Sequence, residues 1–175
     1  MRRILSLFLC LVLILSPVLA APAPTSFLQD YDAIEKASGS VIYLEADDDF
    51  DDEIITTGSG FVAFDSKTFI TNYHVIEDAV WIRAFNESYQ EYEVGKIIAI
   101  DKEMDIAIIS FKTSTDITPL MLADSPNLKR GQPVAAIGYP QGISNTFSTG
   151  IISALVEENG VNEIQFTAPI SQGRD

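Results

Sequence analysis

The chain contains a single histidine, His74, within the segment ITNYHV at residues 70–75. An imidazole ring exchanges a proton near neutral pH, so a histidine that faces a cleft can act as a general base. A lone histidine is more often used for packing or for a structural hydrogen bond. His74 by itself is therefore a candidate catalytic residue with an ordinary structural alternative.

Asp105 is the second candidate, because it stands directly before the apolar run IAII at residues 106–109. A carboxylate at the edge of an apolar core needs a polar partner. A histidine Nδ1–H would serve, and the carboxylate would then hold the ring in the tautomer that leaves Nε2 free as a base. The alternative is a turn residue whose oxygens accept backbone N–H groups. Asp105 alone does not decide between these roles.

The elements that position these residues are predicted to be β-strands. From Ser40 onward, short runs rich in β-branched and aromatic residues alternate with Gly, Asn, Asp and Pro, which is typical of an all-β sandwich or barrel. A short helix is expected within 27–37, and one helical turn at 74–79. The predicted strands are 41–45, 60–64, 69–71, 80–85, 92–100, 106–111, 134–138, 146–155 and 164–167.

The strand pattern divides the chain into regions. A longer connection at 113–130, which contains Pro119 and Pro126, interrupts the strand pattern. Only about three strands follow it, and so few strands cannot close a barrel and remove its edges. The second half is therefore expected to be an incomplete barrel. The predicted regions are a lead-in at 21–37, a first β-barrel at 38–112 that holds His74 and Asp105, a linker at 113–130, and a partial second β-barrel at 131–175.

Residues 1–20 are predicted to be a secretory signal peptide. Arg2 and Arg3 precede an apolar run at 4–15, and small residues lead to a cleavage site after Ala20. The alternative is a membrane anchor, but the run is shorter than the roughly 20 residues that a span needs. We therefore expect an exported protein, periplasmic or secreted, with no stable membrane anchor after cleavage.

The charge of the chain restricts its partners. With 25 acidic and 11 basic residues, the net charge is −14, which argues against nucleic acid as a partner. The acidic run at 47–53 could attract calcium, but it lacks the ligand spacing and the central glycine of an EF-hand loop. A solvated loop is the favoured interpretation, and no metal or cofactor is expected.

Six motifs occur in a fixed order along the chain. They are TGSGFV (57–62), ITNYHV (70–75), DIAII (105–109), AIGYPQG (136–142), STGIIS (148–153) and IQFTAPI (164–170). Together they resemble the HtrA/Deg branch of the chymotrypsin-like serine proteases. The resemblance extends over residues 41–173 and implies an all-β, chymotrypsin-like double β-barrel, with the first barrel complete and the second truncated.

The resemblance also implies a function, that of a serine-type endopeptidase acting on exported or misfolded proteins. By position, His74 would be the general base, Asp105 would orient and support it, and Gly173 would supply one backbone N–H of the oxyanion hole. The reaction would pass through an acyl-enzyme without metal or cofactor. The expected partner is a protein or peptide substrate, and the family often forms homo-oligomers and carries a PDZ domain.

The chain departs from the family pattern at residues 173–175, which read GRD where the family has G-[NS]-S-G-G. Counted from Gly173, the nucleophile falls on Asp175, whose carboxylate would place negative charge where the oxyanion forms. With one inserted residue, serine would come directly after Asp175. The serines nearest to the motifs lie outside any G-x-S-G turn: Ser59, Ser144, Ser153 and Ser171.

No nucleophile is therefore identified within residues 1–175, and we expect this chain alone to be inactive. Two alternatives to the enzyme remain. One is a non-catalytic, protease-like domain that binds peptides or proteins. The other is a truncated gene product.

Overall fold

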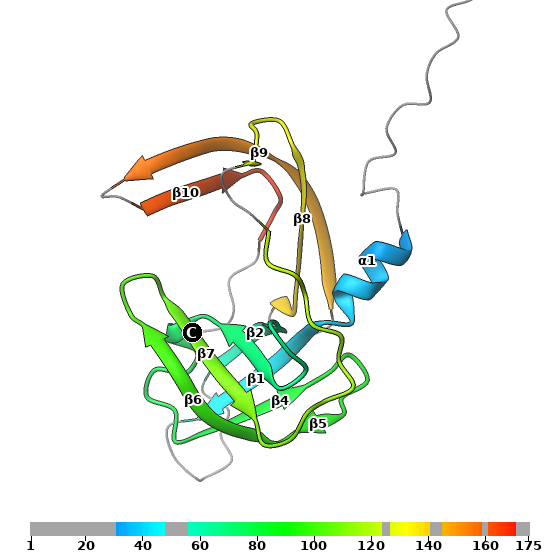
Figure 1. Cartoon of the computed structure of the whole chain (residues 1–175), viewed down its shortest axis with the longest axis vertical. Coiled ribbons are helices and arrows are strands. Elements are labelled where there is room, and N and C mark those ends of the chain that lie inside the picture. The colour runs from blue at the N-terminus through cyan, green and yellow to red at the C-terminus, as the bar shows by residue number, and fades with distance from the viewer. Residues whose placement is uncertain (1–30, 48–55, 124–126, 141–144, 159–160, 171–175) are drawn as a thin grey trace, which may run out of the picture.

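The computed structural model describes residues 31–47, 56–123, 127–140, 145–158 and 161–170. These residues form two antiparallel β-sheets, one of seven strands and one of three, with one α-helix beside them (Figure 1). The predicted signal peptide, the acidic run beyond Asp47 and residues 173–175 lie outside the described ranges. Within those ranges, no helix has the length and apolarity needed to cross a membrane.

The larger sheet contains seven strands in the order β5-β4-β1-β2-β3-β7-β6. Its outermost strands, β5 and β6, follow one another in the sequence with Glu93 alone between them. The sheet therefore curls so that its two edge strands come together at Glu93, in the manner of a β-barrel. The strands are β1 (Val41–Asp47), β2 (Thr56–Val62), β3 (Thr68–Thr71), β4 (Trp81–Phe85), β5 (Glu91–Tyr92), β6 (Val94–Asp101) and β7 (Ile106–Phe111).

β1 lies inside this sheet between β4 and β2, and it is covered on both faces, since nearly all of its side chains are buried and successive side chains of a strand point to opposite sides. Ile42 and Leu44 are 0% exposed and pack in the main core. Tyr43 points the other way, into a second cluster that includes Tyr139. Burial of each such apolar side chain stabilises the fold by about 1.5–3 kcal/mol. The other buried members of the main core are Val62, Phe69, Val75, Ile76, Ala84, Ala107, Ile109, Phe111 and Ile117.

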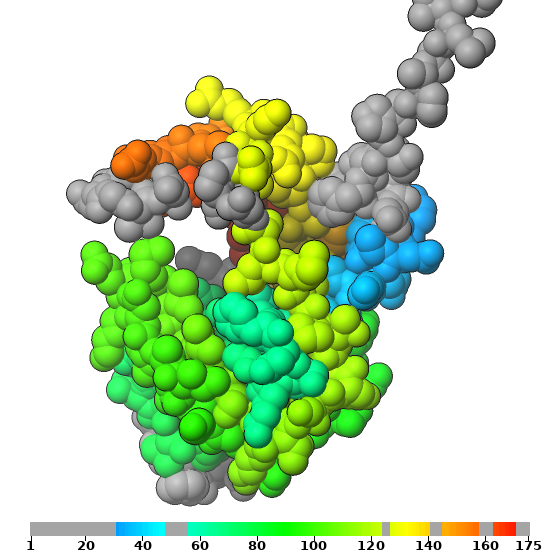
Figure 2. Space-filling view, viewed as in Figure 1, coloured from blue at the N-terminus to red at the C-terminus, as the bar shows by residue number. Residues whose placement is uncertain are grey.

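The smaller sheet consists of β8 (Pro133–Gly138), β9 (Thr146–Glu158) and β10 (Val161–Phe166) in the order β10-β9-β8. β9 is long enough to pair with β8 through its first part and with β10 through the rest. Figure 2 shows open space between this sheet and the β6–β7 end of the larger sheet. Large apolar side chains of the smaller sheet are between 39% and 46% exposed: Phe147, Ile151, Leu155, Ile164 and Phe166.

The all-β class is confirmed, but several predicted strand boundaries are wrong. β2 starts earlier than predicted, at Thr56, and ends at Val62. Phe64 cannot continue it, because its φ of 68° is in the left-handed region. The predicted strand 92–100 is two strands, β5 and β6, separated at Glu93. β9 and β10 both extend further toward their shared hairpin than predicted.

The helical segments were predicted at 27–37 and 74–79. α1 (Tyr31–Ser38) begins within the first of these regions and ends at Ser38, while residues 27–30 lie outside the described ranges. Its last turn closes where the Gly39 N–H donates to the carbonyl oxygen of Glu35 at 2.9 Å. The turn predicted at 74–79 is a 3-10 helix, η2 (Tyr73–Val75). This short helix carries His74.

Candidate active site

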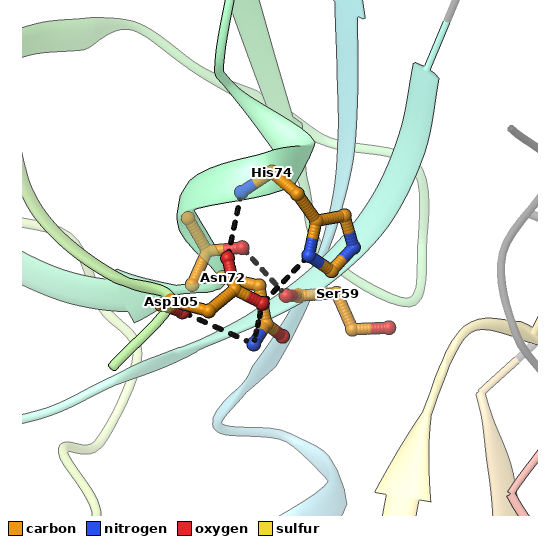
Figure 3. A network of polar contacts seen from close by, with 5 residues as sticks. Ser59, Asn72, His74 and Asp105 are labelled. Carbon is orange, nitrogen blue, oxygen red and sulfur yellow. Dashed lines mark hydrogen bonds and ion pairs between the residues drawn. The ribbon is translucent and has the colours of Figure 1, made fainter. Parts of the chain in front are cut away.

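The structure brings His74 and Asp105 together at one end of the larger sheet (Figure 3). β3 leads into η2, which carries His74, and Asp105 directly precedes β7. The two strands are paired antiparallel, with Thr71 opposite Ala107. Because hydrogen-bonded strands hold their ends in register, the turn after β3 and the turn before β7 are adjacent. The register of β3 on β7 therefore brings His74 and Asp105 together, although they are distant in the sequence.

Two bonds join His74 to the Asp105 carboxylate. The His74 backbone N–H donates to Oδ1 at 2.8 Å, and the ring Nδ1 lies 2.7 Å from Oδ2. An ionised carboxylate has no proton to donate, so the ring donates through Nδ1–H. This tautomer leaves the lone pair on Nε2. The contact that the sequence predicts is thus present, while the catalytic roles of both residues remain a proposal.

The Asp105 turn is held by further bonds from the segment before His74. The Asn72 side-chain amide donates to Asp105 Oδ2 at 3.0 Å and to the Asp105 carbonyl oxygen at 3.2 Å. The Tyr73 N–H donates to the same carbonyl oxygen at 3.1 Å. Asp105 has a φ of 53°, a left-handed conformation that costs most residues about 1–2 kcal/mol and that aspartate adopts more readily. These bonds offset that cost and orient the carboxylate.

Opposing effects act on the pKa of Asp105. Partial burial raises the pKa, whereas hydrogen bonds from the His74 backbone and ring and from the Asn72 amide lower it. The lowering prevails, and the pKa lies below its ordinary value of 3.8. The carboxylate is therefore ionised at neutral pH, as is needed to orient a neutral imidazole and to stabilise its protonated form.

A groove of about 750 Å³ lies between the two sheets beside His74. Its volume is within the range of ordinary ligand pockets. One wall includes Ser59 and His74 from the larger sheet and its turn, and the other includes Tyr139 and Ser148. The His74 side chain is 59% exposed. Within the described part of the chain, its Nε2 makes no hydrogen bond and is accessible to a reacting group.

The described serines beside this groove are engaged in structural hydrogen bonds. Ser59 Oγ accepts the backbone N–H of Tyr139 at 2.8 Å. Ser148 Oγ donates to the carbonyl oxygen of Pro169 at 2.6 Å. Ser153 lies on β9 and does not line the groove. The remaining residues considered for the nucleophile and the oxyanion hole lie outside the described ranges: Ser144, Ser171, Gly173 and Asp175.

Two contacts of this site were not predicted from the sequence. The bond from Asn72 to Asp105 could have been suspected, because Asn72 stands in the motif that carries His74. The bond between Ser59 and Tyr139 joins β2 to the residue that follows β8, and no local pattern indicates it. Among the described residues, no group of three or more His, Cys, Asp or Glu side chains could hold a metal ion.

Comparison with known proteins assigns this geometry to a family. Residues 58–174 match the model of the trypsin-like peptidase domain. A probable periplasmic serine endoprotease, DegP-like, of Buchnera aphidicola is 37% identical over 122 residues, which cover 66% of this chain. Anti-sigma-I factor RsgI9 of Acetivibrio thermocellus is 32% identical over 139 residues, 79% of this chain. The crystal structure of the serine endoprotease from Yersinia pestis matches 87% of this chain with a TM-score of 0.71 and 28% identity.

The chain spans only part of these proteins. It covers 25% of the Buchnera relative, 19% of the Acetivibrio relative and 52% of the Yersinia structure. The family match nevertheless includes the smaller sheet and all of the larger sheet except β1 and the first residues of β2, and it covers the turn of His74 and the turn of Asp105. The chain therefore belongs to the trypsin-like peptidase domain family, and it is of the HtrA/Deg type.

Proposed function

We propose that this chain carries the base and the orienting carboxylate of a serine endopeptidase, with His74 as the general base and Asp105 as its partner. The observation that carries the proposal is the 2.7 Å contact between His74 Nδ1 and Asp105 Oδ2. It directs Nε2 of His74 away from the carboxylate, beside a groove of about 750 Å³. Family membership is consistent with these roles.

In the proposed reaction, Nε2 of His74 accepts the proton of a serine hydroxyl while the serine oxygen attacks the carbonyl carbon of the scissile peptide bond. The resulting imidazolium is stabilised by the ionised carboxylate of Asp105. His74 then gives its proton to the leaving amine, and an acyl-enzyme is formed. Water, deprotonated by the same Nε2, hydrolyses the acyl-enzyme and restores the serine.

The nucleophile and the oxyanion hole are proposed to come from the loop that begins at Gly173. In this proposal, Gly173 supplies one backbone N–H of the oxyanion hole, and the nucleophile supplies the other. Residues 1–175 contain no serine in a G-x-S-G turn, so a polypeptide of these residues alone is expected not to hydrolyse peptides.

The proposed substrates are exported or misfolded proteins, and the proposed location is the periplasm or the medium. The predicted signal peptide at 1–20 and the periplasmic Buchnera relative support export. Assembly into homo-oligomers remains a prediction from the resemblance. A second candidate is a peptide-binding domain without catalysis. It is favoured by Asp175, which occupies the nucleophile position when the motif is counted from Gly173.

The test uses the full-length product of the gene, with its coding DNA read through codon 175. A fluorophosphonate probe, which labels activated serines, is applied to the wild type and to His74→Ala, and hydrolysis of an unfolded protein is followed in parallel. Labelling and hydrolysis that both require His74 support the endopeptidase. Peptide binding without labelling would favour the second candidate and overturn the first.

A further inference from the structure

Tyr139 is a point at which the smaller sheet contacts the larger one. Its side chain is 5% exposed, and the centre of its ring lies 5.7 Å from that of Tyr43 on β1. Its backbone N–H donates to Ser59 Oγ on β2 at 2.8 Å. Ser59 thus provides a polar link between the two sheets at the place where an apolar cluster joins them.

The other side of Ser59 leads to the candidate active site. The Ser59 carbonyl oxygen accepts the Thr71 hydroxyl at 2.9 Å. Thr71 is 5% exposed and ends β3, directly before the turn that carries His74. Ser59 lies close to the contact between His74 and Asp105 (Figure 3). Ser59 therefore connects Tyr139, which directly follows β8 of the smaller sheet, with the end of the strand that positions His74.

Two neighbouring glycines allow this close approach. A Cβ atom added to Gly138 would lie 3.1 Å from Ser59 Oγ, which is closer than most such contacts in proteins. A Cβ atom added to Gly58 would lie 2.6 Å from Cγ1 of Val75, and Val75 belongs to η2. Strand β2 is thus packed directly against the smaller sheet on one side of Ser59 and against the helix of His74 on the other.

We propose that Ser59 is a positioning residue that transmits the docking of the smaller sheet to the pair of His74 and Asp105. The proposal rests on the role of His74 as the general base. Without the Ser59 hydroxyl, the Tyr139 N–H would lose its acceptor in a largely buried place, and the smaller sheet would shift to recover one. The shift would loosen the bond from Thr71 and, with it, the orientation of the His74 ring.

The experiment compares Ser59→Ala with a matched control, Ser110→Ala, in the full-length gene product. Ser110 is 8% exposed, and among the described residues its hydroxyl bonds only to the backbone of Lys96, at 3.2 Å from N and 3.3 Å from O. Both variants therefore remove a hydrogen-bonded hydroxyl from the larger sheet, half-buried at Ser59 and buried at Ser110, but no bond within the described residues links Ser110 to Tyr139. Thr71→Val is a second test of the same path.

Two quantities are measured, the kinetic constants and the exchange with water of the His74 Nδ1–H proton. The proton signal is observed by NMR and assigned by its absence in His74→Ala. In Ser59→Ala we expect kcat to fall about 10-fold with KM nearly unchanged, because a misplaced base weakens the transition state more than substrate binding. We also expect faster exchange of the ring proton. Thr71→Val should act in the same direction, and the double variant less than additively.

The outcomes separate this proposal from the proposed function. If Ser59→Ala matches Ser110→Ala in both kcat and proton exchange, Ser59 is not a positioning residue, even where His74→Ala is inactive. If His74→Ala remains active, the endopeptidase mechanism fails instead. In that case the exchange rate of the ring proton alone decides whether Ser59 orders His74, and an unchanged rate overturns the proposal.

Discussion

The central strands of the larger sheet and the strands of the smaller sheet are similarly apolar, but they differ in how far their side chains are buried. In the larger sheet, Ile42, Leu44 and Phe69 are 0% exposed. In the smaller sheet, Phe147 and Leu155 remain 39% and 43% exposed. The central strands of the larger sheet pack around one shared core, whereas the three strands of the smaller sheet cannot enclose one.

The same contrast applies to the candidate active site. His74, Asp105 and the Asn72 amide that orients them all belong to the larger sheet and its turns. The smaller sheet contributes the opposite wall of the groove and the Tyr139 N–H. The larger sheet therefore holds the candidate base and its carboxylate within hydrogen-bond distance. The open sheet shapes the space that a substrate would occupy.

The largest expected effect tests whether the chemistry belongs to the larger sheet. In the full-length gene product, His74→Ala should lower kcat/KM at least about 1000-fold, because it removes the proposed acceptor of the nucleophile's proton. Ser148→Ala, on the opposite wall, should change kcat/KM by less than about 10-fold. Stability should hardly change in His74→Ala, since the side chain is 59% exposed. Comparable losses of kcat/KM in His74→Ala and Ser148→Ala would contradict the idea that the chemistry belongs to the larger sheet.

A pair of phenylalanine substitutions tests the difference in burial. Phe69→Ala should lower the free energy of unfolding by about 3–5 kcal/mol, because it leaves a cavity in an enclosed core. Phe147→Ala should lower it by only about 1 kcal/mol, because much of its ring already contacts water. Urea unfolding of both variants gives the two values. Equal losses would mean that the apolar face of the smaller sheet is covered in solution.

The pH dependence of stability tests the bonds to Asp105. Its pKa is lower in the folded protein than its ordinary value of 3.8, so ionised Asp105 stabilises the folded state above that pH. As the pH falls below 3.8 and through the folded pKa, this stabilisation should be lost. The difference in unfolding free energy between the wild type and Asp105→Asn should therefore narrow below pH 3.8. A difference that stays constant from pH 7 to pH 2 would show that these bonds do not favour the ionised carboxylate.

The smallest expected effect concerns the contact between the sheets. Burial, with smaller contributions from Glu87 and Tyr89, raises the pKa of the Tyr139 hydroxyl to about 12. Within the described residues, this hydroxyl has no hydrogen-bond partner. Tyr139→Phe should therefore leave stability unchanged or raise it by up to about 1 kcal/mol at neutral pH.

The alkaline range sharpens this last comparison. A pKa that is raised on folding contributes stability that is present below pH 10, the ordinary value for tyrosine, and is lost as the pH rises toward 12. Tyr139→Phe should lose less stability than the wild type over that interval, as measured by urea unfolding at each pH. If Tyr139→Phe lowers the free energy of unfolding at neutral pH by more than about 1 kcal/mol, the hydroxyl has a hydrogen-bond partner and the interpretation is wrong.

Much of the site could be predicted from the sequence because its residues stand in short, local motifs. His74 and Asp105 were identified from their flanking segments, and the structure brings them into contact. The boundaries of β2 and the break at Glu93 were not predicted, because they depend on a left-handed backbone at Phe64 and on the curl of the sheet. Neither feature has a local signal in the residue types.

The sequence by itself determined the all-β class, the family and the residue types of the candidate base and carboxylate. Only the tertiary structure decided that the register of β3 on β7 joins their turns, and that Tyr139 donates to Ser59. The physical reason is that motifs record which side chains are available. Hydrogen-bond partners across two sheets depend on how strands curl and dock, which is a property of the whole fold.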